Sequence, residues 1–271
     1  MLKTGRVINV RSGGTGDLPL IVVHGGSGSS RLCAELLSAL PGRIRWWAVD
    51  LPGHGESSWT PGRYGLDIVG ATLAEWAERE IPTPAWWYGH SYGGQAVLAA
   101  AGAVPRVFAG LVLGDTPLSP ERMYRILDHS VERLRRWREW CGRPEAELVE
   151  LLGGEAYGDG TFADALGRDH PYLLGMAASL RRHDPEFLGA LLDDRETVYE
   201  CLVHAESWLA ATPGPALLLR GDPAVMAMTS EEDSALVRST GGTVRSLPGV
   251  GHGLHHFAPA AVAEALDGFI G

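Results

Sequence analysis

The order of its apolar segments constrains the fold of this chain most strongly. In the first 115 residues, short runs rich in β-branched and aromatic residues alternate with segments of helical periodicity. This alternation is typical of a mostly parallel sheet that helices cover on both faces. The predicted strands are Arg6–Val10, Leu18–His24, Ile44–Asp50, Ala85–Gly89 and Gly110–Gly114. The predicted helices are Arg31–Leu40, Leu66–Glu80 and one that begins at Ser91.

The pattern changes after Asp115, because Pro117 and Pro120 interrupt the chain and the next ninety-odd residues contain helical segments only. The predicted helices there are Glu121–Trp140, Pro144–Leu152, Tyr172–His183 and Arg195–Leu209. Strand patterns resume at Ala216–Arg220 and Thr243–Leu247, each followed by a loop and a helix, the last near Pro259–Ile270. We therefore predict an α/β core made of residues 1–115 and 213–271, with residues 116–212 inserted as an all-helical cap.

Composition narrows the class of protein. A chain of 271 residues fits one domain with an inserted subdomain, and 45% apolar with 21% charged residues is typical of a globular protein. The net charge of −10 repels phosphate backbones, so nucleic acid is not an expected partner. We find no secretory signal and no membrane span, which predicts a cytoplasmic protein. Whether it is a monomer or a homodimer stays open.

The cysteines do not indicate a metal or redox site. Cys33, Cys141 and Cys201 are odd in number and widely spaced, and no CxxC pair or Cys/His cluster accompanies them. Structural zinc and redox motifs need such close pairs. We expect three buried thiols.

The strongest chemical signal is Gly89-His90-Ser91-Tyr92-Gly93, which follows an apolar strand and precedes a helical run. Glycines on both sides of a serine permit the sharp turn that exposes its hydroxyl between strand and helix. A serine hydroxyl needs a base to act as a nucleophile, and the charge that develops on its substrate needs hydrogen-bond donors. A loop of small residues, 24–30, and a histidine, His252, both follow predicted strands.

Four motifs together resemble the α/β-hydrolase superfamily, and in particular its capped serine esterases. They are HGGSGSS (24–30), DLPGHGES (50–57), GHSYGG (89–94) and GVGHGLHHFAP (249–259). The resemblance implies that Ser91 is the nucleophile and His252 the general base. It also implies an oxyanion hole formed by the backbone N–H groups of Gly26 and Tyr92.

The acid that orients the histidine departs from the commonest family pattern. That pattern has an Asp three residues after a Gly in the loop before the histidine, and counting from Gly221 the position is Ala224. Asp222 lies in the same loop, two residues earlier. Asp115, at the end of an earlier strand, occupies a site that some family members use. We predict Asp222, with Asp115 as the alternative.

The other histidines of these motifs are expected to pack or to form hydrogen bonds: His24, His54, His90, His255 and His256. Aromatic and thioether side chains of the cap are the candidate lining of a substrate pocket: Trp137, Trp140, Tyr172, Met176 and Trp208. Residues 116–212 hold 11 arginines and 18 acidic residues, which disfavours anionic substrates.

A serine at the turn disfavours dehalogenase and epoxide hydrolase chemistry, which needs an Asp nucleophile there. The sequence therefore predicts a serine hydrolase that cleaves a carboxylic ester or lactone of a small, mainly neutral molecule, without metal or organic cofactor. The same residues would also serve C–C bond or amide hydrolysis, or perhydrolysis. A different class is a ligand-binding or cyclase-like protein that keeps the fold without turnover.

Overall fold

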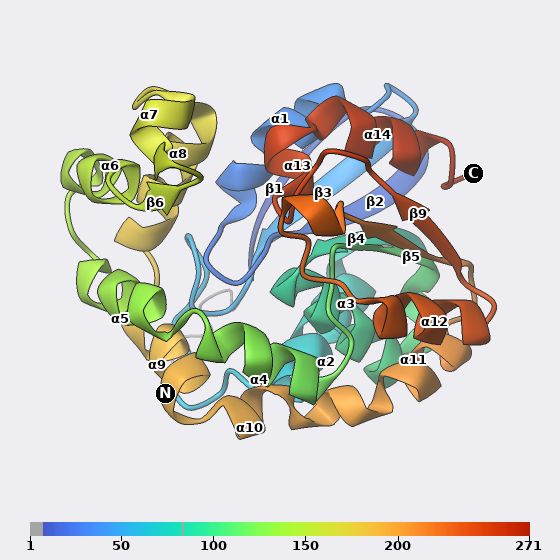
Figure 1. Ribbon diagram of the computed structural model, residues 1–271. Coiled ribbons are helices and arrows are strands. Elements are labelled where there is room, and N and C mark those ends of the chain that lie inside the picture. The colour runs from blue at the N-terminus through green and yellow to red at the C-terminus, as the bar shows by residue number, and fades with distance from the viewer. Residues whose placement is uncertain (1–7, 83) are drawn as a thin grey trace, which may run out of the picture.

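A computed structural model describes residues 8–82 and 84–271 of the chain. Within these ranges, seven strands form one sheet in the order β1-β3-β2-β4-β5-β8-β9 (Figure 1). Strand β1 pairs antiparallel with β3, and the other neighbouring strands pair parallel. Arg6 and Val7, where the first predicted strand begins, lie outside the described residues. The strands are β1 (Asn9–Gly13), β2 (Leu18–Val23), β3 (Ile44–Asp50), β4 (Ala85–His90), β5 (Phe108–Gly114), β8 (Ala216–Arg220) and β9 (Thr243–Ser246).

Helices cover both faces of the sheet, as the alternating pattern predicts. Leu20 and Val22 of β2 pack in a cluster with residues of α1 (Ala34–Ala39) and α14 (Pro259–Asp267). The intervening Ile21 and Val23 pack in a second cluster with residues of α2 (Leu66–Glu80) and α3 (Tyr92–Ala103). Because successive side chains of a strand point to opposite faces, a strand buried on both faces is apolar throughout. Helix α12 (Glu231–Ser239) contributes Val237 to the α2–α3 face, and α13 (Leu254–Phe257) precedes α14.

The parallel strands bring the four sequence motifs to one edge. The motif 24–30 follows β2, the motif 50–57 begins at the last residue of β3, Ser91 follows β4, and His252 lies in the loop after β9. Asp115, the alternative acid, follows β5 at the same edge. The carboxyl ends of parallel strands lie along the same edge, and ligands of open α/β sheets bind there. The topology therefore assembles in space what the sequence separates by up to 228 residues.

The segment between β5 and β8 is mostly helical. Besides its helices, it holds two-residue strands, β6 (Ala156–Tyr157) and β7 (Gly160–Thr161), that pair antiparallel and were not predicted. The predicted helix 121–140 is interrupted at His129 and Ser130, and the helix over 185–193 was missed. The division into core and cap stays a prediction. The helices are α4 (Pro120–Asp128), α5 (Val131–Trp140), α6 (Glu145–Gly153), α7 (Phe162–Leu166), α8 (Pro171–Arg181), α9 (Pro185–Asp193), α10 (Arg195–Tyr199) and α11 (Ala205–Ala211).

Helix α9 anchors this segment to the edge that carries the motifs. The Phe187 side chain is fully buried, and its ring lies edge-on to Tyr92, 5.0 Å between centroids, and to His54 at 4.5 Å. The backbone N–H of Asp184 donates to the Gly53 carbonyl at 2.8 Å, and the Tyr64 hydroxyl donates to the Asp184 carboxylate. Residues from the predicted cap thus touch the nucleophile turn directly.

Truncation of Phe187 tests this anchor. We expect Phe187→Ala to lower the free energy of unfolding by about 3 to 5 kcal/mol, because it leaves a cavity among buried rings. Leu174→Ala, at a half-exposed position of α8, is the matched control and should change it by less than about 0.5 kcal/mol. Urea unfolding followed by tryptophan fluorescence measures both, and equal effects would contradict the anchoring role.

Candidate active site

Ser91 occupies a strained turn between β4 and α3. Its φ of 53° and ψ of −123° lie in a region that non-glycine residues rarely adopt, and its N–H donates to the Gly114 carbonyl at 2.9 Å. A Cβ at Gly93 would lie 2.1 Å from the His24 carbonyl oxygen, so only glycine permits the approach of α3 to the end of β2. Such strain costs on the order of 1 to 3 kcal/mol and is concentrated at functional sites.

The backbone N–H groups of Gly26 and Tyr92 lie next to this turn. A Cβ at Gly26 would be 3.2 Å from the Tyr92 Cβ, so the two residues are in contact. The Gly25 carbonyl accepts from the Gly28 N–H at 3.0 Å and from His24 Nδ1–H at 2.7 Å. Because a trans peptide points its N–H away from its C=O, this fixes the direction of the Gly26 N–H. The Tyr92 N–H lies in the first turn of α3, where helical geometry provides no intrahelical acceptor.

His24 positions this loop as a neutral imidazole. The Leu51 N–H donates to its Nε2 at 3.0 Å, so Nδ1 carries the proton that it donates to Gly25. Burial, together with the neighbouring His54, lowers the pKa of His24 to about 4. The Gly26 carbonyl, in turn, accepts from His183 Nε2 at 3.2 Å and lies 2.9 Å from His54 Nε2. One histidine from the predicted cap and two from the core thus hold the Gly25–Gly26 peptides.

The carboxylate of Asp115 accepts a hydrogen bond from His252 Nδ1–H at 2.7 Å. Asp115 is fully buried at the end of β5, in a left-handed conformation with φ 38°. Burial alone would raise the pKa of Asp115, but hydrogen bonds from His252, the Met228 N–H at 2.7 Å and the Thr229 hydroxyl at 2.6 Å lower it below its usual range. A carboxylate on Nδ1–H leaves Nε2 of His252 as the nitrogen that can accept a proton.

Asp222, the acid predicted from the sequence, does not contact His252, and in this respect the prediction is wrong. The carboxylate of this half-buried residue accepts from the backbone N–H groups of Ala224, at 2.9 Å, and Gly249, at 2.8 Å. The side chain therefore folds back onto its own turn, as Asp side chains at turns often do. The 2.7 Å bond from the Asp222 N–H to the Val250 carbonyl further ties this turn to the loop that carries His252.

The loop of His252 is fixed to the nucleophile turn by His90. His90 Nε2–H donates to the His252 carbonyl at 2.7 Å, and the two rings lie 4.6 Å apart. His90 immediately precedes Ser91. The structure therefore brings the predicted nucleophile, the predicted base and the alternative acid to adjoining positions.

The candidate pocket residues lie in different parts of the structure. The Tyr172 ring lies 5.2 Å from that of His256, close to the His252 loop. Trp140 and Met176 are buried in an apolar cluster with Leu32, which Trp137 also packs against. Trp208 does not lie near the Ser91 turn, contrary to the prediction. It packs against Gly102, which is about 15 Å from Tyr92 along α3 at a rise of 1.5 Å per residue.

A cavity of about 340 Å³ lies elsewhere on the molecule, beside Asp50. Its lining includes Arg11, Arg31 and Arg182, whereas Ser91, Asp115 and His252 do not contribute to it. Among the described residues, one group of three side chains, His90, His255 and His256, has the spacing to hold a metal ion. No helix within the described part of the chain is both long and apolar enough to cross a membrane.

A model of the alpha/beta hydrolase family matches residues 20–265. The chain belongs to this family. Solved structures of similar fold include an esterase of Thermogutta terrifontis, which is 25% identical, with a TM-score of 0.68 over 96% of this chain and 92% of its own. An enol-lactonase of Burkholderia xenovorans is 19% identical, with a TM-score of 0.72 over 97% and 95%.

Curated relatives of this alpha/beta hydrolase match over shorter stretches. A pimeloyl-[acyl-carrier protein] methyl ester esterase of Xylella fastidiosa is 35% identical over 36% of this chain and 36% of its own length. Lipase LipV of Mycobacterium tuberculosis is 32% identical over 44% and 45%. The matches thus span less than half of these relatives.

Sequence reasoning missed residues that support the candidate site. His183 and Asp184 were not singled out, and Phe187 was expected only as part of the aromatic surface of the cap. Asp184-Pro185 nevertheless carries the signal of a helix start: an Asp N-cap before a Pro at the first helical position. What the sequence does not reveal is that this helix end meets Gly26 and Tyr64, because those residues lie more than 100 positions away.

The hydrogen-bond geometry predicts which acid matters. Asp115→Asn should slow the labelling of Ser91 by an aryl phosphonate by about 10² to 10⁴, because the histidine loses its orienting charge. Asp222→Asn, the matched control on the neighbouring loop, should slow it less than tenfold. Labelling rates by mass spectrometry, with unfolding curves to confirm that both variants fold, measure this. The reverse order would refute the assignment of Asp115.

Proposed function

We propose that this chain is a serine hydrolase that cleaves a carboxylic ester or lactone of a small, mainly neutral molecule. The observation that carries the proposal is the buried Asp115–His252 pair beside a strained serine at the strand–helix turn. Strain at Ser91 costs free energy, and the hydrogen bond between Asp115 and His252 comes in addition to those that join the Asp115 carboxylate to the neighbouring loops. Both have a chemical use in acyl transfer.

In the proposed reaction, Ser91 Oγ attacks the substrate carbonyl carbon while His252 Nε2 takes the hydroxyl proton. The tetrahedral oxyanion accepts hydrogen bonds from the Gly26 and Tyr92 N–H groups. As the C–O bond of the ester breaks, the histidine gives its proton to the leaving alcohol, and the acyl group stays on Ser91. Water then attacks the acyl-enzyme with the same histidine as base, which releases the acid and restores the serine. Asp115 remains ionised throughout and stabilises the charged imidazole.

The named relatives support ester cleavage over other acyl transfers. The methyl ester esterase, the lipase, the Thermogutta esterase and the enol-lactonase all act on esters or lactones by their names. Amide and C–C bond hydrolysis would use the same residues and are the alternatives. Kinetics would distinguish a ligand-binding or cyclase-like protein from a hydrolase, because such a protein would release at most one equivalent of product from an aryl ester.

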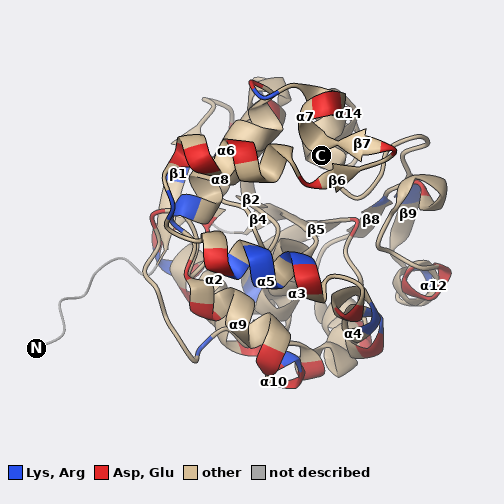
Figure 2. Ribbon diagram, turned by 60° about the vertical axis from the view of Figure 1, so that its left-hand side comes forward, with Lys and Arg blue, Asp and Glu red and all other residues tan. Residues whose placement is uncertain are grey.

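Charge on the segment between β5 and β8 supports a neutral substrate. Helix α5 carries both basic and acidic residues on its outer surface (Figure 2). Arg138 pairs with Glu186 and Asp193, Arg136 with Glu155, and Arg168 with Glu150. Arginines engaged in this way are poorly placed to attract a substrate carboxylate, and the acidic excess of the segment repels one.

Removal of the nucleophile is the first test of this function. Ser91→Ala should lower kcat for a neutral aryl ester by about 10⁴ to 10⁶ and abolish phosphonate labelling, because the covalent step depends on that hydroxyl. Ser239→Ala, an exposed serine of α12, is the matched control and should behave as wild type. Turnover by Ser91→Ala within tenfold of wild type would exclude the mechanism.

Substrate charge provides a second test. We expect kcat/KM for a neutral aryl or medium-chain ester to exceed that of its carboxylate-bearing analogue, and the gap to narrow as salt screens the field. Initial rates for the matched pair at low and moderate ionic strength measure this. Equal values, or a preference for the anion, would reject a neutral substrate.

A further inference from the structure

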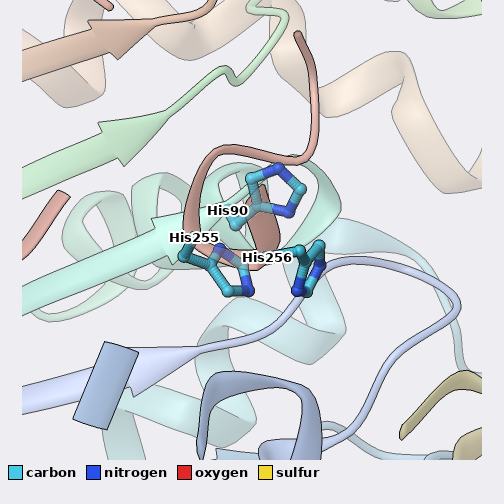
Figure 3. A group of neighbouring side chains, drawn as sticks. All are labelled: His90, His255 and His256. Atoms are coloured by element: carbon cyan, nitrogen blue, oxygen red, sulfur yellow. The ribbon is translucent and has the colours of Figure 1, made fainter. Parts of the chain in front are cut away.

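Three histidines form a cluster behind the nucleophile turn. His90 comes from the end of β4, and His255 and His256 are consecutive residues of α13 (Figure 3). One ring nitrogen from each lies within 4.8 Å of those of the other two. The ring centroids of His255 and His256 are 4.0 Å apart, and that of His90 is 4.7 Å from His255. The mechanism proposed above uses none of these side chains chemically.

His90 presents a lone pair to this cluster. Its Nε2 lies 2.7 Å from the His252 carbonyl, which can only accept, so Nε2 carries the proton. In the neutral ring, Nδ1 is then an unprotonated acceptor. This nitrogen is buried without a hydrogen-bond partner, on a residue that is only 4% exposed. In Figure 3 the ring edge toward His255 and His256 carries a nitrogen. A buried acceptor without a donor is costly, and it indicates a missing partner.

The other two rings adjoin that of His90. The ring centroids of His90 and His256 are 5.7 Å apart, and His255 is buried and His256 half-buried in α13. His255 Nδ1 lies 3.0 Å from the Tyr88 hydroxyl and can donate to it, and Nε2 then faces the weakly donating thiol of Cys33, whose Sγ is 4.0 Å away and which a metal ion would displace. A second hydrogen bond of this kind, from the far nitrogen of a ligating histidine, is the usual support of a metal ligand.

We propose that His90, His255 and His256 bind a divalent late first-row transition metal ion such as Zn²⁺, and that this binding inhibits turnover. Three imidazoles suit Zn²⁺, Ni²⁺ and Cu²⁺ rather than Mg²⁺ or Ca²⁺, which prefer oxygen ligands. Zn–N bonds of about 2.0 to 2.1 Å bring tetrahedral ligand atoms about 3.4 Å apart, so the rings move inward by about 1 Å.

The inhibitory part rests on the proposed function and follows from the neighbours of the cluster. His90 is covalently joined to Ser91 and hydrogen-bonded to the His252 backbone, while His255 and His256 follow His252 by three and four residues. A metal ion therefore draws together the segments that carry the nucleophile and the base. Displacement of a reacting group by about 1 Å can slow a reaction about 10²-fold.

Direct titration tests the site without reference to activity. Untagged protein, freed of metal with a chelator, should bind one equivalent of Zn²⁺ by calorimetry, and Co²⁺ should give visible absorption bands typical of nitrogen ligation. His256→Phe, which keeps an aromatic ring beside Tyr172 and Phe257, should weaken Zn²⁺ binding by at least about tenfold. His129→Gln, at an exposed histidine of the α4–α5 junction, is the matched control and should bind as wild type. If His256→Phe does not fold, His256→Asn replaces it.

The same samples test the inhibition. One equivalent of Zn²⁺ should lower kcat for a neutral aryl ester about 10- to 100-fold in wild type and His129→Gln, with recovery on addition of EDTA. His256→Phe should need at least about tenfold more Zn²⁺ for the same fractional loss. Absence of stoichiometric binding, or equal affinity in His256→Phe, would refute the site. Binding at the site with kcat unchanged would refute the inhibition alone, and absence of esterase activity without metal would refute the proposed function and leave the site standing.

Discussion

The candidate site depends on the hydrogen bonds that the buried carboxylate of Asp115 accepts. It accepts hydrogen bonds from His252, from the backbone of Gly221 and Met228, and from Thr229, and so joins the end of β5 to the loops that follow β8 and β9. An ionised group with no exposed surface is stable only when such donors replace water. The same bonds that stabilise this charge therefore fix the position of the histidine. The same hydrogen bonds therefore set the geometry of the site and stabilise the loops at this edge of the sheet.

The serine turn is held from the opposite side by the predicted cap. His183 donates to the Gly26 carbonyl, and Phe187 packs against Tyr92, so residues after α8 support both expected oxyanion donors. This part of the insert is fixed by buried contacts and differs from the exposed surface of α5 and α6, where arginines form ion pairs in water. Exposed pairs of that kind contribute little to stability. We infer that loss of the Phe187 contact would disturb the nucleophile turn before it disturbed the sheet.

Histidines serve three purposes around this edge. His24 is a neutral donor that orients a peptide, His252 is the expected base, and His90 joins the His252 loop to the Ser91 turn by its hydrogen bond to the His252 carbonyl. The sequence analysis expected His90, His255 and His256 to pack or to form hydrogen bonds, which accounts for their burial but not for the unpartnered Nδ1 of His90. This unpartnered nitrogen supports the proposed metal site. Because His90 immediately precedes Ser91, an ion bound to His90 would also affect the expected nucleophile.

The sequence by itself determined the sheet and singled out Ser91 and His252 as the candidate reactive residues. Leu66–Glu80 and Ala216–Arg220 were predicted with their observed bounds, because hydrophobic periodicity and chain breaks are local signals. Ser91 and His252 were recognisable since each lies in a motif beside a strand. Only the tertiary structure decided between Asp115 and Asp222. Both follow a strand of the same sheet, and the choice depends on a side-chain direction: Asp222 caps its own turn, whereas the left-handed backbone of Asp115 places its carboxylate at His252. For the same reason the roles of His183, Phe187 and Trp208 were out of reach, because each depends on contacts between residues distant in the chain.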